Sequence, residues 1–247
     1  CIRDSLYTII NNIKYMATSM QYLIRKLHKG KTTEANLSNL IYRELRELIT
    51  YGKLNPGEKI IESKLIRHFN ISRTPVREAI KMLEATGFVE AVHNKGTYVK
   101  KMSVEELENI YDVLSALEGF AVHITTQNIT SKQIEMLEKS NSKLRRLNSP
   151  AKRKKYVEKN VEFHSLFSQF SGNNFLRDLI QETRNRVYRY RIGGIAMEGH
   201  IHEFILDHEG IIETIKRGDA QKSEEKMRQH IGRTKNVLAD FLREFLL

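Results

Sequence analysis

The sequence predicts a mainly α-helical protein: three short helices and a hairpin, followed by an all-α bundle of six helices. Helical spacing of apolar residues gives way to two short β-type segments in the first part. Six longer helical segments, almost without proline, make up the second. Residues 1–102 carry 18 Lys and Arg against 9 Asp and Glu, whereas residues 103–247 carry 23 against 21. We therefore expect domains at residues 36–102 and 103–247, and an extension of unknown role at residues 1–35.

The composition excludes several classes of protein. Of 247 residues, 40% are hydrophobic and 29% are charged, which suits a packed soluble core. The single cysteine, Cys1, excludes an intramolecular disulfide scaffold, and no apolar run reaches the roughly 18 residues that a membrane helix needs. The net charge of +11 favours a polyanionic partner for the basic first part. Charge alone leaves nucleic acid, an anionic membrane surface and a solvated face without a partner as alternatives.

The first two helices have clear end signals. Apolar residues at helical spacing begin at Leu37, and Gly52 ends this helix because glycine readily adopts the left-handed conformation. A turn at Asn55-Pro56-Gly57 follows. The second helix fits residues 62–69, closed by Asn70, which also tolerates that conformation.

The third helix and the hairpin follow at once. Thr74 is expected to cap the helix, with Pro75 in its first position, and Gly87 ends it. A turn then joins two short strands; the strands and the turn are expected at residues 88–92, 97–99 and 93–96.

This order of elements is that of a winged helix-turn-helix, whose third helix enters the major groove of DNA with its N-terminal residues foremost. In this chain that end carries Arg73, Thr74 and Arg77. Arginine can bind guanine O6 and N7 with two hydrogen bonds, and a helix N-terminus donates N–H groups to phosphate. The hairpin tip, residues 93–96, is basic and short enough to reach the adjacent groove or backbone. We predict double-stranded DNA as the partner; the alternative is that both arginines are ordinary solvated residues.

Six helices are expected in the second part. Ser103 to Glu106 forms a capping box that opens the first of them. Their expected spans are 103–126, 131–147, 152–171, 174–192, 200–217 and 220–245. Consecutive helices joined by short connections predict an all-α bundle.

Three histidines and one asparagine lie within the apolar stripes of these helices, the rows of hydrophobic residues at helical spacing that are expected to face the core. Asn160 and His164 lie four residues apart on one helix face, and His208 and His230 lie on the stripes of the last two helices. The other histidines of the bundle, His123, His200 and His202, fall off the stripes. Imidazole suits divalent transition metals, and an amide oxygen can fill a fourth position. We predict a metal site, with zinc first and nickel, cobalt, iron or manganese as alternatives; histidines satisfied within the core without an ion are the other interpretation.

Residues 37–102 resemble the winged helix of the GntR family of bacterial transcription regulators. The resemblance rests on residues 57–62, 71–79 and 83–89, whose order and spacing hold across the module. It implies binding of operator DNA as a two-fold dimer. Some relatives have an Arg where this chain has Ser63, and Lys64 is the candidate to supply that contact. The expected DNA contacts are Lys64, Ser72, Arg73, Thr74, Arg77, His93, Asn94, Lys95 and Gly96.

Residues 103–245 resemble the FCD-type effector domain of the FadR branch of that family, and six helices are closer to its VanR-type subgroup. The motifs are residues 117–121, 163–167, 172–176, 208–219 and 227–230. The family's metal ligands, an Asp or Asn followed by three His, carry over onto Asn160, His164, His208 and His230.

Two departures from the family pattern bear on the site. Asn160 replaces the commoner Asp, so the site loses a negative charge. Leu114 lies where relatives often have an Arg, so an anionic effector would need another group. Arg184 is a candidate for effector binding, and the alternative is that it is a surface arginine.

These features predict a cytoplasmic, dimeric, metabolite-responsive DNA-binding regulator, a repressor and not an enzyme, with no membrane partner. A small organic acid would complete the coordination of the metal with a carboxylate oxygen and thereby weaken operator affinity. One alternative is a regulator that responds to the metal ion without an organic effector. Another, a metal-dependent hydrolase, lacks a general base, because Glu162 should point away from the face of Asn160 and His164.

Overall fold

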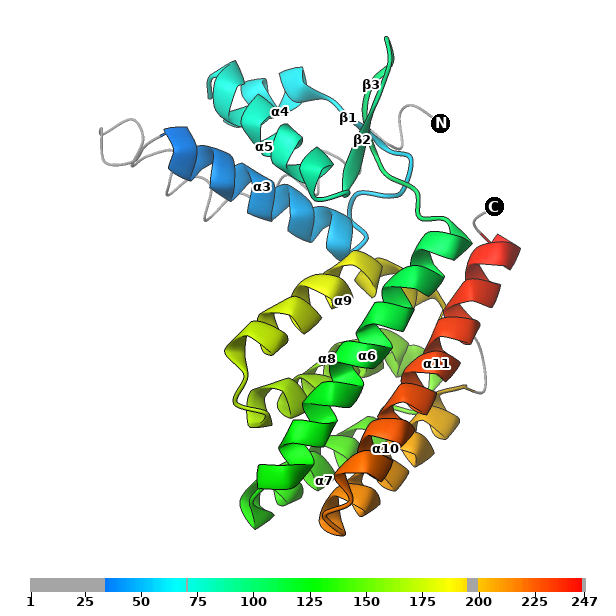
Figure 1. Cartoon of the computed structure of the whole chain (residues 1–247). Helices are drawn as coiled ribbons and strands as arrows, with labels where there is room; N and C mark the ends of the chain where they lie inside the picture. The colour runs from blue at the N-terminus through cyan, green and yellow to red at the C-terminus, as the bar shows by residue number, and fades with distance from the viewer. Residues whose placement is uncertain (1–33, 70, 195–199, 246–247) are drawn as a thin grey trace. The chain divides into compact units, whose positions relative to one another are not determined.

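The computed structural model describes residues 34–69, 71–194 and 200–245, and it confirms the mainly helical fold (Figure 1). Contacts between residues divide the chain into two compact units, with the division between Met102 and Ser103. Nearly all of the expected extension, residues 1–33, lies outside the described residues. Asn70, which is expected to end the second helix, also lies outside them.

The first unit combines three helices with a small antiparallel sheet. The helices are α3 (Glu34–Thr50), α4 (Glu62–Phe69) and α5 (Arg73–Ala85), and the strands are β1 (Lys59–Ile60), β2 (Val89–Val92) and β3 (Gly96–Val99). The predicted hairpin is β2 and β3, with Asn94 at a φ of 58° in its turn. β1 pairs with β3, giving the order β1-β3-β2. β1 was not predicted, because two residues are too few to show alternation.

Helix α5 begins two residues earlier than expected, so the predicted cap at Thr74 is wrong. The N-cap is Ser72, whose backbone is extended (φ −69°, ψ 164°), and Arg73 is the first helical residue. Pro75 is therefore the third helical residue instead of the first. The helix accommodates it because N–H groups of the first turn have no partner within the helix, so the missing N–H of proline costs no hydrogen bond.

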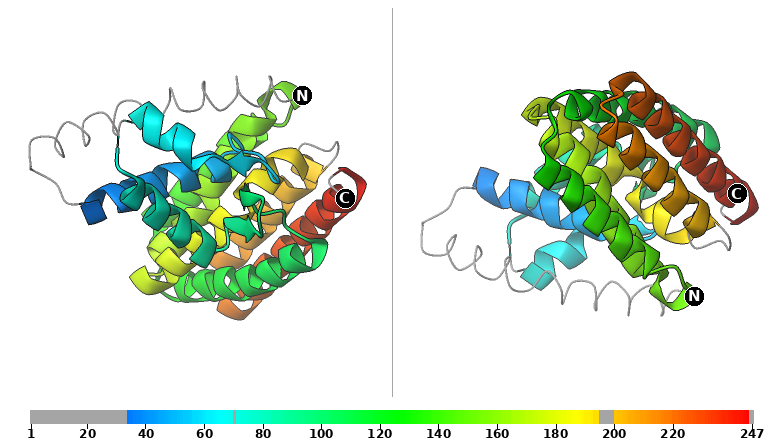
Figure 2. Two further views of the ribbon diagram at one scale, coloured as in Figure 1. Left: turned by 90° about the horizontal axis from the view of Figure 1, so that it is seen from above. Right: turned by 90° about the horizontal axis from the view of Figure 1, so that it is seen from below.

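The second unit contains the six predicted helices, with ends within two residues of those expected. They are α6 (Val104–Asn128), α7 (Ser131–Arg145), α8 (Arg153–Phe170), α9 (Asn174–Gly194), α10 (His200–Lys216) and α11 (Ala220–Phe245). A short 3₁₀ turn, η1 (Pro150–Lys152), precedes α8. Ser103 caps α6, because its Oγ accepts a hydrogen bond from the N–H of Glu106 at 3.0 Å. The helices gather into one bundle in both views of Figure 2.

The packing of the bundle brings three helices around α8. α6 packs along α11, beside which it lies in Figure 1, while α8 contacts α6, α7 and α9, and α10 contacts both α7 and α11. The buried face of α8 contains aromatic residues such as Phe163 and Phe167, both at most 1% exposed. The same face also carries Asn160 and His164, so a row of polar side chains enters the hydrophobic core.

Candidate metal centre

Three histidine side chains from three helices meet in the interior of the second unit. His164 lies on α8, His208 on α10 and His230 on α11, and each is at most 2% exposed. Nε2 of His230 lies 3.3 Å from Nε2 of His208 and 3.3 Å from Nε2 of His164. The possible ligand nitrogens of all three lie within 4.8 Å of one another. The structure therefore brings together these three histidines, which we call the histidine centre.

Each ring of the histidine centre is held through its other nitrogen, Nδ1. The Nδ1 partners are Glu118 Oε2 for His164 at 2.8 Å, Asn141 Oδ1 for His208 at 3.1 Å, and Asp207 Oδ2 for His230 at 3.2 Å. Carboxylate and amide oxygens accept hydrogen bonds, so each Nδ1 carries the proton and donates it. Each Nε2 is left with a lone pair, and the three lone pairs face one another.

Burial keeps the histidine centre neutral. Desolvation lowers the pKa of His164 and of His208 well below the ordinary 6.5, and the positive charges of Arg184 and Arg191 lower both further. Desolvation also lowers the pKa of His230, although the hydrogen bond and charge of Asp207 oppose this shift. Neutral imidazole is the form that binds metal ions, so the centre has the protonation state that a metal site needs.

The donor atoms fit a tetrahedral divalent ion. Zn–N bonds of about 2.0–2.1 Å at tetrahedral angles place two ligand nitrogens roughly 3.4 Å apart, and two of the nitrogen pairs here are 3.3 Å apart. Asn160, one turn before His164 on α8, is 3% exposed, and its Oδ1 has no hydrogen-bond partner among the described residues. A buried amide oxygen without a partner is suited to a further ligand position.

Arg184 is buried, so the alternative that it is a surface arginine is wrong. It lies on α9 and is 3% exposed. Its Nε donates a hydrogen bond to Glu118 Oε1 at 2.7 Å, and its Nη2 donates to the same oxygen. Burial lowers the pKa of Arg184, and the charge of Glu118 opposes this shift. Glu118 thus connects Arg184 to His164 through its two carboxylate oxygens.

Three further buried polar residues were not among the predicted site residues: Tyr111 on α6, Tyr156 on α8 and Arg191 on α9. Both tyrosines are at most 1% exposed, and Arg191 is 3% exposed. Burial raises the pKa of both phenols, so both hydroxyls stay protonated and can donate hydrogen bonds. One signal was present in the sequence: Arg184 and Arg191 are seven residues apart, two helical turns, and so share one face of α9.

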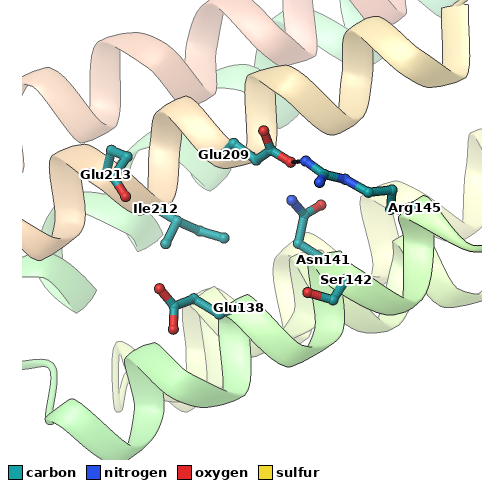
Figure 3. A pocket seen from close by; sticks show the side chains of 7 residues that line it. All are labelled: Glu138, Asn141, Ser142, Arg145, Glu209, Ile212 and Glu213. Atoms are coloured by element: carbon teal, nitrogen blue, oxygen red, sulfur yellow. Dashed lines mark hydrogen bonds and ion pairs between the residues drawn. The ribbon is translucent and has the colours of Figure 1, made fainter.

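A separate hollow of about 370 Å³ opens between α7 and α10 (Figure 3). Arg145 of α7 forms an ion pair there with Glu209 of α10, and Asn141 belongs both to this lining and to the partners of His208. Three glutamates against one arginine make the hollow a poor site for an anion. Its lining residues are Glu138, Asn141, Ser142, Arg145, Glu209, Ile212 and Glu213.

In the first unit, the residues expected to contact DNA are accessible. Arg77 Nε lies 3.2 Å from Glu62 Oε2, an ion pair in which 61% of the arginine side chain is exposed. Lys64 on α4 is half-buried. The other expected contacts are exposed, at the N-cap of α5, on α5 itself and in the hairpin: Ser72, Arg73, Thr74, Arg77, His93, Asn94, Lys95 and Gly96.

A winged helix with exposed arginines at the start of its third helix, in one chain with a helical bundle around a histidine centre, defines a DNA-binding regulator with a sensor domain. The chain belongs to the GntR family: residues 37–99 match bacterial regulatory proteins, gntR family, and residues 109–233, half of the chain, match the FCD domain. The resemblance seen in the sequence is thereby confirmed. The protein is a DNA-binding transcription regulator with an FCD effector-binding domain.

Curated relatives and solved structures agree with this assignment. YdhC from Bacillus subtilis (strain 168), an uncharacterized HTH-type transcriptional regulator, is 26% identical over 191 residues, which cover 77% of this chain and 84% of YdhC. The HTH-type transcriptional repressor RspR from Escherichia coli (strain K12) is 27% identical with the same coverage. The structure of E. coli McbR/YncC shares the fold, with a TM-score of 0.64 at 19% identity over 83% of this chain and 97% of that one.

The family and its members are transcriptional regulators and not enzymes. The geometry agrees at Glu162, which is exposed and bonds Lys159 at 2.7 Å instead of facing the histidine centre. Across the described ranges of the chain, helices long and apolar enough to span a membrane are absent.

Proposed function

We propose that this regulator is a repressor that binds operator DNA as a dimer and senses a small carboxylate at a divalent metal ion. The ion would be held by Asn160, His164, His208 and His230. The observation that carries the proposal is the convergence of three Nε2 lone pairs in a buried space, with every Nδ1 already engaged. Partial negative charges that face one another at 3.3 Å are stabilised by a cation between them.

Zinc is the first candidate, and nickel, cobalt, iron(II) and manganese are the alternatives. Nitrogen ligands near the tetrahedral spacing favour zinc, which can expand from four ligands to five, so that a carboxylate oxygen could join the four protein ligands. Oxygen acceptors that bind the other ring nitrogen and so orient every imidazole are typical of such sites, because they fix the tautomer and raise the basicity of the ligand nitrogen.

A carboxylate effector is supported by the charges around the centre. None of the four proposed ligands is anionic, so the positive charge of the ion would face neutral donors. The nearest acids are already paired: Glu118 with Arg184, and Asp207 with Arg233. An organic anion would therefore supply the charge that the protein ligands do not.

The dimer and the repressor role rest on the class of protein and its relatives. Helix-turn-helix dimers bind two half-sites about one turn of DNA apart, so their affinity for an operator depends on the spacing between the DNA-binding domains of the two subunits. Both RspR and GlaR, at 27% and 26% identity, are named as transcriptional repressors. A carboxylate that binds one arrangement of these two domains more tightly than the other can change operator affinity by up to the difference between its two binding free energies.

The test combines metal analysis with DNA binding. Full-length protein without a histidine tag should hold about one divalent ion per chain and bind, as a dimer, an operator selected from a random DNA pool. Small carboxylates should release that operator in a metal-dependent way. The variant His164→Gln should lose the ion, whereas His202→Gln, at an exposed histidine of α10, should keep it. Equal metal content in the parent and His164→Gln would contradict the proposal.

A second candidate is a regulator whose signal is the metal ion alone. The complete burial of His208, at 0% exposure, favours it, because a small ion needs less space in a packed interior than an organic molecule does. In that case operator release would follow metal concentration without any carboxylate. The same mobility-shift series separates the two candidates.

A further inference from the structure

The interior of the second unit holds four buried hydrogen-bond donors without a partner among the residues that the structure describes. They are Nη1 of Arg184, Nε of Arg191 and the hydroxyls of Tyr111 and Tyr156, and we call these residues the donor group. Folded proteins pair nearly all of their buried polar groups, so four unpaired donors in one domain require an explanation. All four can donate to an anion, and both arginines add positive charge.

The donor group lies on three helices that pack against one another. Tyr111 comes from α6, Tyr156 from α8 and both arginines from one face of α9, and these helices contact each other in pairs. The charge of Arg191 opposes the rise that burial causes in the pKa of both phenols, and it adds to the fall in the pKa of each ring of the histidine centre. The donor group is therefore buried where α6, α8 and α9 pack together, the same part of the bundle that contains Glu118 and His164.

Glu118 sets the distance between the donor group and the histidine centre. One of its oxygens accepts from Arg184 Nε at 2.7 Å, and the other lies 2.8 Å from His164 Nδ1. One carboxylate, two hydrogen bonds and the ring of His164 thus lie between an arginine of the donor group and the metal-facing Nε2. We infer that a ligand that reaches both sites has a short carbon chain.

The charges in this region require more than one negative group. Glu118 compensates Arg184, but the described part of the chain provides no ion pair for Arg191, which is 3% exposed. A buried charge is costly unless it is paired and hydrogen-bonded. An effector with a single carboxylate, bound to the metal, would leave Arg191 without an ion pair and the two phenols without a hydrogen-bond partner.

We propose that the effector is a short dicarboxylate: one carboxylate binds the metal ion, and the second accepts hydrogen bonds from Arg184, Arg191, Tyr111 and Tyr156. The first contact rests on the proposed function, and the second rests on the donor group alone. Arginine and phenol donors suit a carboxylate because charge-assisted hydrogen bonds are about twice as strong as neutral ones.

The first experiment compares ligands on the zinc-loaded full-length protein. Thermal shift and calorimetry would use the straight-chain dicarboxylates from malonate to adipate, each beside the monocarboxylate of the same carbon number, and phosphoglycolate as a mixed anion. One dicarboxylate should bind at least tenfold more tightly than its monocarboxylate. If dicarboxylates bind no better than monocarboxylates, or if phosphoglycolate binds more tightly than every dicarboxylate, the inference is wrong.

The second experiment removes single donors. Arg191→Gln should abolish the preference for the dicarboxylate while zinc and monocarboxylate binding persist, and Arg186→Gln, at an exposed arginine of α9, should change neither. Tyr111→Phe and Tyr156→Phe delete only hydroxyls without a partner, so they should leave folding intact and weaken dicarboxylate binding severalfold. If Arg191→Gln and both Phe variants keep the full preference, the donor group does not bind the ligand.

The outcomes separate this inference from the function on which it builds. A protein that binds neither zinc nor any carboxylate contradicts the proposed function. A zinc-loaded protein that binds monocarboxylates and dicarboxylates equally well contradicts only the dicarboxylate.

Discussion

Asn160 decides whether the proposed metal ion has an anionic protein ligand. Its Oδ1 is buried without a partner among the described side chains and backbone groups, one helical turn from His164. The substitution Asn160→Asp changes the charge of this ligand and almost nothing of its shape, so it isolates electrostatics from packing.

We expect Asn160→Asp to bind zinc at least tenfold more tightly, because a carboxylate partly neutralises the ion. Without metal, the same variant should be less stable than the parent, because a carboxylate is then buried without the ion that would neutralise it. Chelator competition measures the affinity, and urea denaturation in EDTA measures the stability. Asn160→Ala is the control, and it should bind zinc more weakly than the parent. Tighter binding by Asn160→Ala would remove this residue from the ligand set.

Acid should destabilise the metal-free protein. The pKa values of His164, His208 and His230 are lowered in the folded protein, whereas in the unfolded chain they return to about 6.5. Below that pH the unfolded chain binds protons that the folded protein does not, so the free energy of unfolding falls as pH falls. Above it these groups add no pH dependence.

The expected slope is up to about 1.4 kcal/mol per pH unit for each histidine, in urea denaturation between pH 6.5 and about 5. His208→Gln should reduce the slope, and the exposed control His202→Gln should not. A free energy of unfolding that is constant across this range would show that the three rings are protonated in the folded protein.

At the level of elements, α5 presents its arginines on the face opposite its packed residues. Arg73 and Arg77 are exposed, while Val76 and Leu83 are fully buried. Arg73→Ala and Arg77→Ala should each weaken operator binding by about 1–3 kcal/mol and relax sequence preference, as loss of a guanine contact does. Lys81→Ala, exposed further along the same helix, should have a small effect. Mobility shifts against the selected operator and a scrambled duplex would measure this, and undiminished specificity in the double arginine variant would place recognition elsewhere.

Most elements could be predicted from local sequence signals. The ends of all six helices of the bundle lie within two residues of expectation, because capping residues and glycines mark them. The start of α5 was wrong because Pro75 is tolerated at any position of a first turn, so proline alone does not fix the helix start. The strand β1 was missed because it is defined by its pairing with a segment some forty residues later.

The candidate site was predictable from the sequence only for residues that lie on the apolar face of their own helix. His164, His208 and His230 stood on apolar stripes and are buried together. Glu118 and Arg191 were missed because an acid or a base within a buried face is interpretable only once its partner on another helix is known. The contacts of Glu118 with His164 of α8 and Arg184 of α9 are a tertiary property that periodicity within one helix cannot reveal.

At the scale of the whole molecule, zinc should stabilise one unit and leave the other unchanged. A ligand stabilises the fold that binds it by about 2.7 kcal/mol at a hundredfold excess over Kd. All four proposed ligands lie in the second unit. Hydrogen exchange should therefore slow in α8, α10 and α11 on addition of zinc and stay the same in α3 and α5. Equal slowing in both units would show that the two fold as one.

The order of the ligands along the chain has a consequence for synthesis. The last of them, His230, lies near the C-terminal end of the described residues, whereas the winged helix is complete by Val99. Domains emerge from the ribosome and fold in order, so the winged helix can fold well before the four proposed metal ligands are all synthesised. A nonsense codon or proteolytic cut between these positions would leave a fragment that still carries α5 but lacks a proposed metal ligand. Such a fragment could bind DNA, and the proposed effector could not release it.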